Sequence, residues 1–219
     1  MTVARRKVLA LLGLSSAALL APGLTRPGQA STEEETAFAA KLLAAVPPHG
    51  ERSLGRPDAP VVMVEYASAT CPHCAEFHMK VLPDIKKTYI DTGKVRLIFR
   101  EFPLDQRALA VFMLTRCVPE DKYFPTVDLV FRRQQVWNGD NAKAELQKVL
   151  GMAGLSAAEF DACLKREDLA KAIVETWKVG KEQFGVKGTP TFFVNGRFVD
   201  GHEDVASVAK AIEDALAAR

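Results

Sequence analysis

The sequence predicts an α/β fold with a central mixed β-sheet and an inserted all-helical domain. A β-branched run at 61–66, a helical pattern and an apolar run at 95–102 form a strand–helix–strand unit, whose two strands pair in parallel. Near the C-terminus, Asn195-Gly196 lies between two apolar runs, which predicts an antiparallel hairpin because both turn residues accept positive φ. The sequence between these two units is helical, and it accounts for the insertion.

Prolines and glycines mark where the elements of the first half bend and end. Pro47-Pro48 ends an amphipathic N-terminal helix, Pro83 predicts a kink within the second helix, and Gly93 ends that helix. The expected elements are a helix at 31–46, an extended segment at 52–55, a strand at 61–66, a helix at 72–89 and a strand at 95–102.

Helical periodicity dominates the second half of the chain up to the hairpin. Gly151 and Gly154 mark one break, and after it Ser156 and Glu159 have the spacing of a capping box, which predicts the start of a helix. The expected helices are 108–117, 123–136, 141–152, 156–164 and 169–184, with a last one at 205–216.

The composition is that of a soluble globular protein with one domain of ordinary size and an embellishment. The 219 residues are 48% hydrophobic and 26% charged, without a charge block or a low-complexity tract. The net charge is +2, and it falls to −2 without residues 1–30, which carry four basic residues and no acidic one. Neither value suggests a nucleic acid or an anionic membrane as a partner.

Residues 1–30 have the pattern of a signal peptide. Arg5-Arg6-Lys7 is followed by an apolar stretch at 8–21 and then by the small-x-small sequence Gly28-Gln29-Ala30. The apolar stretch is too short for a membrane span, and no cysteine follows it to carry a lipid. The two arginines fit either a general secretory (Sec) or a twin-arginine (Tat) signal. We therefore expect an exported, periplasmic protein, in a compartment where disulfides persist.

The motif Cys71-Pro72-His73-Cys74 joins the first long strand to the helix after it. Pro72 fits the first helical position, which places Cys71 at the N-cap and Cys74 one turn further in. The unpaired N–H groups and the positive end of the helix dipole then favour a thiolate at Cys71, and His73 would act in the same direction. Since the thiolate is the attacking species in disulfide exchange, we predict that Cys71 attacks and that Cys74 resolves.

Two other interpretations of the cysteine pair are weighed against redox chemistry. The pair could be half of a zinc site, with His78 four residues after Cys74, but no second Cys-x-x-Cys or His-x-x-x-His completes four ligands. The pair could also be a structural disulfide, although a disulfide that closes so short a loop seldom serves to stabilise a fold. We therefore expect a redox pair and no metal.

These features together resemble the thioredoxin superfamily, and more narrowly the DsbA-type thiol:disulfide oxidoreductases. They are Cys71-Pro72-His73-Cys74 after an apolar strand, Thr189-Pro190 before a hairpin, and a helical block between them. The resemblance covers residues 58–216 and implies a thioredoxin-like fold. Thioredoxins proper are less similar, because they carry Gly-Pro between the cysteines and lack the helical block.

The resemblance implies a role for each matching residue. Cys71 would be the nucleophile and Cys74 the resolving thiol. His73 would stabilise the Cys71 thiolate, which makes the disulfide a strong oxidant. Pro190 would be a cis-proline that faces the disulfide, and Thr189 would offer its backbone groups to an extended substrate segment.

Glu65 lies six residues before Cys71, where the family has a buried acid below the active site. A carboxyl group in an apolar strand would have a raised pKa and could move the proton of Cys74. The alternative is an ordinary glutamate at the surface of a strand edge. Its neighbours Val64 and Tyr66 favour burial.

Cys117 and Cys163 depart from the simplest pattern of the family. They fall on separate segments of the helical block, and we predict a second, structural disulfide between them. Two buried free thiols, or a redox pair that tunes Cys71, are the alternatives. The expected domains are a signal peptide at 1–30, an N-terminal extension at 31–58, a thioredoxin-like domain at 59–103 and 167–219, and a helical insertion at 104–166.

The function implied is that of an exported oxidase which introduces disulfides into newly exported proteins. It needs no cofactor, acts on reduced, unfolded proteins as a monomer, and is reoxidised by a quinone-linked membrane partner. One rival is a reductase or isomerase on the same fold, although residues 31–58 are too few for the dimerisation domain usual in isomerases. The other rival is a non-catalytic zinc-binding or chaperone module.

Overall fold

The computed structural model describes residues 27–199 and 204–218. The predicted signal peptide therefore lies outside the described residues, apart from its last four positions, which begin the first helix. Among the helices that are described, none combines the length and apolar character needed to cross a membrane.

Helices and strands follow the predicted order. They are α1 (Pro27–Ala44), β1 (Arg52–Leu54), β2 (Val61–Ala67), α2 (Pro72–Glu76), η1 (Phe77–Val81), α3 (Leu82–Ile85), η2 (Lys86–Ile90), β3 (Val95–Glu101), α4 (Gln106–Arg116), η3 (Glu120–Lys122), α5 (Tyr123–Arg132), α6 (Gln134–Trp137), α7 (Ala142–Met152), α8 (Ala157–Cys163), α9 (Glu167–Gln183), β4 (Thr191–Val194), β5 (Arg197–Val199) and α10 (Val205–Ala217).

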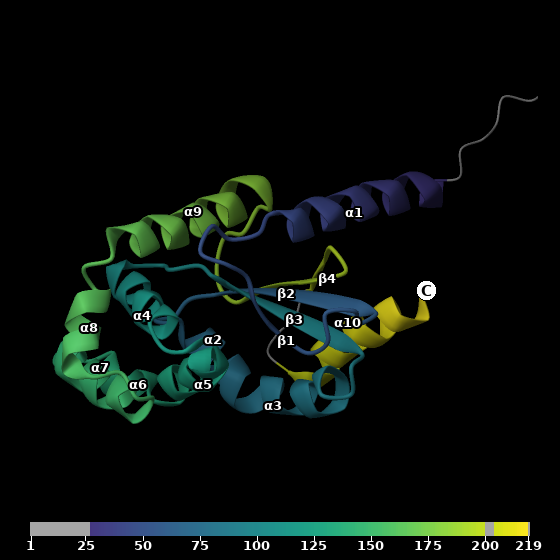
Figure 1. Cartoon of the computed structure of the whole chain (residues 1–219). Coiled ribbons are helices and arrows are strands. Elements are labelled where there is room, and N and C mark those ends of the chain that lie inside the picture. The colour runs from purple at the N-terminus through teal and green to yellow at the C-terminus, as the bar shows by residue number, and fades with distance from the viewer. Residues whose placement is uncertain (1–26, 200–203, 219) are drawn as a thin grey trace, which may run out of the picture.

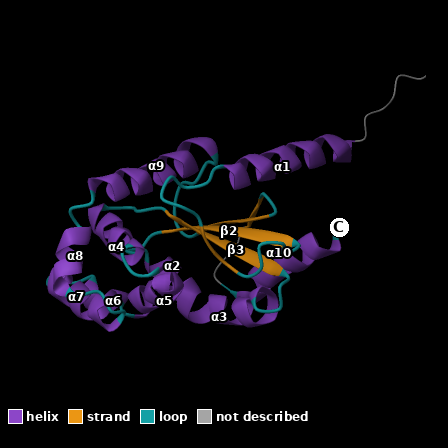
Figure 2. Ribbon diagram, in the orientation of Figure 1, coloured by secondary structure: helices purple, strands orange, loops and turns teal. Residues whose placement is uncertain are grey.

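The sheet is mixed, as the sequence predicts, with the strand order β1-β3-β2-β4-β5 (Figure 2). β2 and β3 are parallel, whereas β1 pairs with β3, β4 with β2 and β5 with β4 in antiparallel fashion. The hairpin between β4 and β5 turns at Asn195 and Gly196, whose φ angles are 46° and 84°. Positive φ at both positions is what the Asn-Gly pair allows, so the predicted hairpin is confirmed.

Helices cover both faces of the sheet (Figure 1). Because side chains alternate along a strand, Val64 and Tyr66 of β2 pack on one face with Leu42 of α1. Met63 packs on the other face, against the helical run from α2 to η2 and against α10. Glu65 lies two residues after Met63 and so points to that second face, below the helix that begins with the cysteine motif.

The helical run from Pro72 to Ile90 contains two π-helical turns, η1 and η2, which periodicity alone does not predict. The first of them lies directly before Pro83, where the sequence predicts a kink. In it the N–H of Leu82 donates to the carbonyl of Phe77, five residues back. A proline has no N–H and clashes with the preceding turn, so a widened turn at this place accommodates it.

The helical insertion between β3 and β4 has a core of its own, and this core is continuous with the cysteine motif. The helix predicted at 123–136 is wrong as one element, because it breaks at Arg133 (φ −105°, ψ 12°) into α5 and α6. The break turns Gln134 and Trp137 inward, and the Trp137 indole donates to the carbonyl of Val130 at 2.7 Å. Burial of two large side chains thus overrides helical continuity.

A buried ionic cluster ties the end of β3 to the insertion and to the loop before β1. Glu101, which is fully buried, is hydrogen-bonded to Arg116, to the Tyr123 hydroxyl at 2.7 Å and to His49 at 3.2 Å. Burial by itself raises the pKa of Glu101, but the His49 hydrogen bond and the Arg116 charge outweigh it and lower the pKa to about 2. The carboxylate is therefore ionised inside the fold.

This cluster predicts a loss of stability in acid. A carboxyl whose folded pKa is about 2, against an ordinary 4.5, contributes stability that is complete above pH 4.5 and is lost as the pH falls toward 2. We expect Glu101→Gln to lower the free energy of unfolding at neutral pH by about 3–5 kcal/mol, because it leaves Arg116 buried without a counter-charge. The variant should also show a shallower decline below pH 4.5 in denaturant titrations.

The matched control is Glu167→Gln, which removes an exposed carboxylate 3.5 Å from Lys171. Its unfolding curve should follow that of the wild type at every pH, since exposed pairs contribute little. Equal pH dependence in the Glu101→Gln variant and the wild type would contradict the assignment.

Candidate active site

The site is built on the N-terminus of α2. Cys71 is the N-cap residue in an extended conformation (φ −75°, ψ 121°), and Pro72 is the first residue of the helix, as the sequence predicts. Within the part of the chain that the structure describes, no side chain forms a capping hydrogen bond at this helix end. The free N–H groups of the first turn therefore point at the Cys71 side chain, and both cysteines are reduced in the structure.

This position favours the thiolate of Cys71. The pKa of Cys71 is lowered from 9.0 to about 5, first by a hydrogen bond from the Cys74 thiol. Burial opposes the change, whereas the Thr189 side chain and the backbone N–H groups of Cys74 and His73 support it. At neutral pH the reduced protein therefore carries an anionic sulfur at residue 71.

Cys74 has the opposite character. Its side chain is fully buried, and this burial raises the pKa of the thiol well above 9.0. The neighbouring Cys71 and the charge of Glu65 raise it further. The two sulfurs of one motif thus differ in charge at neutral pH, with the thiolate on the residue nearer the surface.

The loop before β4 lies against the Cys71 sulfur. The Thr189–Pro190 peptide bond is cis, and the Cys71 thiol donates to the carbonyl oxygen of Thr189 at 3.1 Å. The Thr189 hydroxyl is buried and has no hydrogen-bond partner among the described residues, so it is free to donate to the sulfur once Cys71 is a thiolate. The structure thus brings Thr189 and Pro190 together with the motif, although Cys71 and Thr189 are 118 residues apart in sequence.

Glu65 and His78 form a buried pair below the motif. Glu65 is fully buried, and the Nε2 atom of His78 lies 3.0 and 3.2 Å from its two carboxyl oxygens. His78, considered above only as a zinc ligand, is 3% exposed and belongs to η1. Its position on the buried face of the helix was a usable sequence signal for such a contact.

The insertion supplies two further contacts that the sequence does not reveal. The ring of Phe131, at the end of α5, stacks on His78 with centroids 4.3 Å apart. The side-chain amide of Gln134 donates to the carbonyl oxygens of Ala69 and Cys71 at 2.8 and 2.9 Å. A lone glutamine in a helical pattern carries no sign of such a role.

The remaining predicted residues lie as follows. His73 is exposed, and its backbone N–H contributes to the lowered pKa of Cys71. Cys117 and Cys163 are joined in a disulfide with 6.2 Å between their Cα atoms, at the end of α4 and the end of α8. Across residues 27–199 and 204–218, no three His, Cys, Asp or Glu side chains are grouped to hold a metal ion.

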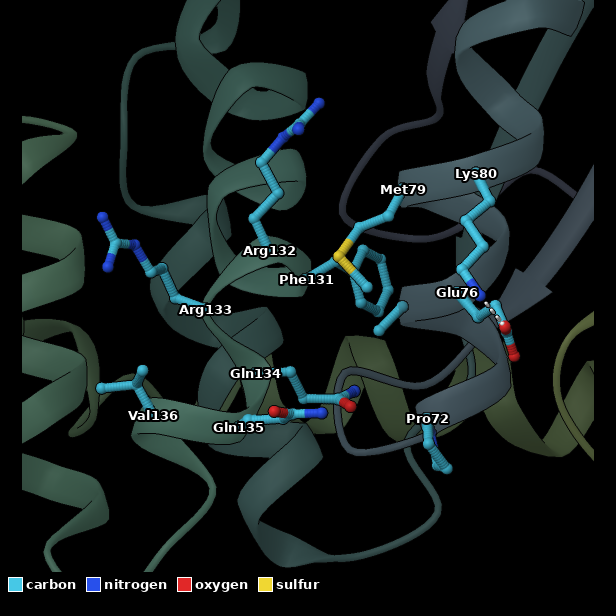
Figure 3. A pocket seen from close by; sticks show the side chains of 11 residues that line it. Pro72, Glu76, Met79, Lys80, Phe131, Arg132, Arg133, Gln134, Gln135 and Val136 are labelled. Atoms are coloured by element: carbon cyan, nitrogen blue, oxygen red, sulfur yellow. Dashed lines mark hydrogen bonds and ion pairs between the residues drawn. The ribbon is translucent and has the colours of Figure 1, made fainter.

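Two open cavities flank Pro72. One of about 670 Å³ is lined by Cys71 and reaches to Leu104 and Arg107, so the nucleophilic residue borders an open cavity although it is only 5% exposed. The other, of about 540 Å³, lies between α2–η1 and the α5–α6 segment (Figure 3). Gln134 projects from that segment toward the turn before Pro72.

A thiolate beside a protonated thiol, at a helix N-terminus and opposite a cis-proline loop, is the arrangement of a dithiol that forms and exchanges disulfides. The fold and this site define a thioredoxin-like protein. The family profile described as Thioredoxin matches residues 48–214, which is most of the chain.

Similar proteins show which kind of thioredoxin-like protein this chain is. A putative protein-disulfide oxidoreductase of Rickettsia bellii is 32% identical over 165 residues, 74% of this chain and 63% of that protein, so the chain spans less than two thirds of its length. The probable disulfide bond formation protein D of Bacillus anthracis is 32% identical over 76% of this chain and 78% of that protein. The crystal structure of Wolbachia pipientis alpha-DsbA1 is 32% identical, with a TM-score of 0.74, over 80% of this chain and 96% of that chain.

The chain therefore belongs to the thioredoxin family and, within it, to the DsbA-type disulfide oxidoreductases. The mixed sheet with a helical insertion agrees with this membership.

The site predicts that the Cys71 thiol ionises near pH 5. The reaction of the reduced protein with iodoacetamide should be half-maximal there and not near 9.0. Because the folded pKa is depressed, the thiolate stabilises the reduced fold fully above pH 9.0, and this contribution is lost as the pH falls to about 5. The oxidised protein has no such group, so only its reduced form should gain stability across this range.

Ultraviolet absorbance of the thiolate against pH provides the second measurement. The Cys71→Ser variant is the control and should lack the transition. A transition of the wild-type protein near 9.0 would contradict the assignment.

Proposed function

We propose that the protein is an exported thiol:disulfide oxidoreductase that introduces disulfide bonds into newly exported proteins. The observation that carries this proposal is the asymmetry of the motif, a stabilised thiolate at Cys71 beside a buried, protonated Cys74. Stabilising the thiolate favours the dithiol over the disulfide. The Cys71–Cys74 disulfide is then readily reduced by other thiols, which makes it an oxidant.

The reaction starts from the Cys71–Cys74 disulfide. A substrate thiolate attacks Sγ of Cys71, the bond between the two enzyme sulfurs breaks, and Cys74 leaves with the electron pair. A second thiolate of the substrate then attacks the substrate sulfur of this mixed disulfide. Cys71 leaves as a thiolate, which its low pKa makes a good leaving group. Two electrons pass from the substrate to the enzyme, and each substrate thiol loses a proton to solvent.

In this scheme Glu65 transfers a proton to the sulfur of Cys74. The sulfur of Cys74 is released as an anion inside the fold, where its raised pKa makes it take up a proton. The Glu65 carboxyl points from β2 toward the helix that begins with the cysteine motif, and it is hydrogen-bonded to His78. Its charge raises the pKa of Cys74. A buried carboxyl near the thiol can pass the proton without opening the site to water.

The loop at Thr189 and Pro190 is assigned to substrate binding. It lies against the Cys71 sulfur, through the Thr189 carbonyl at 3.1 Å. A substrate segment bonded to Cys71 would run beside this loop, where backbone groups can pair with an extended chain in the manner of an added strand.

The partners and compartment follow from the same scheme. Turnover needs an oxidant that converts the dithiol back to the disulfide, and we assign this role to a quinone-linked membrane oxidase. The substrates are reduced, unfolded exported proteins. Residues 1–30 have the pattern of a signal peptide, which supports export by the Sec or the Tat route and a periplasmic location. We propose that the protein acts as a monomer and needs no cofactor.

The Cys117–Cys163 bond is assigned a structural role. It joins α4 to α8 across a sequence separation of 46, and both helices line the core of the insertion. A loop of this length contributes about 4 kcal/mol to stability in the loop-entropy account.

A direct comparison of two activities separates an oxidase from a reductase or isomerase on the same fold. We expect the oxidised protein to oxidise a reduced, unfolded substrate rapidly and the reduced protein to reduce insulin only slowly, because the stabilised thiolate disfavours giving up electrons. The Cys71→Ser variant should lack both activities. Fast insulin reduction with slow substrate oxidation would identify a reductase.

The roles of the two cysteines predict a trapped intermediate. Cys74→Ser cannot form the Cys71–Cys74 disulfide, but its Cys71 thiolate can attack a disulfide already present in an exported protein, and one sulfur of that disulfide leaves as a thiolate. The mixed disulfide at Cys71 then has no neighbouring thiol to resolve it, so complexes with exported proteins should accumulate. Non-reducing gels of cells that export the variant would show them as bands removed by a reductant. The Cys71→Ser variant should form none, and the absence of such bands for Cys74→Ser would count against the assigned roles.

A further inference from the structure

Gln134 joins the helical insertion directly to the backbone of the cysteine motif. Its Nε2 donates to two carbonyl oxygens, of Ala69 at 2.8 Å and of Cys71 at 2.9 Å. The side chain is 6% exposed and projects from the α5–α6 segment toward the motif (Figure 3). The break at Arg133 is what directs it there, since a continuous helix would place residue 134 differently.

These two carbonyls belong to the turn that sets the place of Cys71. The turn is closed by the N–H of Cys71, which donates to the carbonyl of Ser68 at 3.1 Å, and α2 begins where Ala75 donates to the Cys71 carbonyl at 3.2 Å. Gln134 therefore holds the cap residue itself and the residue two positions before it. If the amide were lost, the Cys71 carbonyl would keep its hydrogen bond from the Ala75 N–H, but the buried Ala69 carbonyl would lose the bond from Gln134. A buried acceptor without a partner costs about 1–3 kcal/mol, so the turn would shift or admit water.

The place of Cys71 decides its reactivity. The stabilisation of an anion by a helix N-terminus falls off within the first turn, and it depends on the alignment of the N–H groups with the anion. A shift of the cap residue would weaken the hydrogen bonds from the His73 and Cys74 N–H groups. In the disulfide form the sulfur is uncharged, so the same shift would cost the oxidised protein less.

We propose that Gln134 is a positioning residue through which the helical insertion sets the reactivity of Cys71. It acts by fixing the turn at 68–71, so that the sulfur meets the N-terminus of α2 in the reduced protein. This inference rests on the proposed function of Cys71 and Cys74 as a redox pair.

The test compares Gln134→Met with Gln135→Met. Methionine has nearly the volume of glutamine and no donor, and Gln135 is the exposed neighbour in the same helix. We expect Gln134→Met to raise the pKa of Cys71 by about 0.5 to 1, the worth of one hydrogen bond. The equilibrium with a glutathione buffer should shift about 3- to 10-fold toward the disulfide. Gln135→Met should match the wild type in both.

A structural role alone would give a different result. It would lower the stability of the oxidised and reduced proteins equally, with the Cys71 titration and the glutathione equilibrium unchanged, and this result would overturn the inference. We expect the reduced form of Gln134→Met to lose more stability than its oxidised form. If the methionine variant does not fold, Gln134→Asn, which keeps the amide but shortens its reach, is measured in the same way.

The wild-type titration separates this inference from the proposed function. A wild-type Cys71 that ionises like a free cysteine would overturn the proposed function. A wild-type Cys71 that ionises near pH 5, with Gln134→Met identical to it, would overturn the positioning role alone.

Discussion

The contact between the Cys71 sulfur and the N-terminus of α2 is the interaction on which the rest of this structure depends. The Cys74 thiol and the first N–H groups of the helix stabilise the thiolate enough to bring its pKa to about 5, although burial opposes this. The disulfide form has no charge for these groups to stabilise. The same contact therefore makes Cys71 reactive, a good leaving group and part of an oxidising pair.

Several elements far apart in the sequence hold this contact in place. The loop before β4 brings Thr189 to the sulfur, and the insertion brings Gln134 to the backbone of the turn. Below them, Glu65 and His78 satisfy each other inside an apolar core, where an unpaired charge would be costly. Phe131 of the insertion packs against His78, so the insertion also contacts this buried pair.

The sequence predicted the fold best where local rules decide. The Asn195-Gly196 hairpin, the parallel strand pair and the Pro72 helix start all depend on neighbours in the chain, and each is confirmed. The prediction was wrong for the single helix at 123–136, which breaks at Arg133. Helical propensity there yields to the burial of Gln134 and Trp137, a long-range effect that no periodicity encodes.

By itself, the sequence determined which residue types carry the chemistry and how they are spaced: two thiols one helical turn apart after a buried strand, with the first at the N-cap. Only the tertiary structure decided what surrounds those thiols. It buried Cys74, paired Glu65 with His78, and placed Gln134 against the Cys71 carbonyl. The reason is physical, because a pKa depends on burial and on charges and donors within a few ångströms, and these come from segments that only folding brings together.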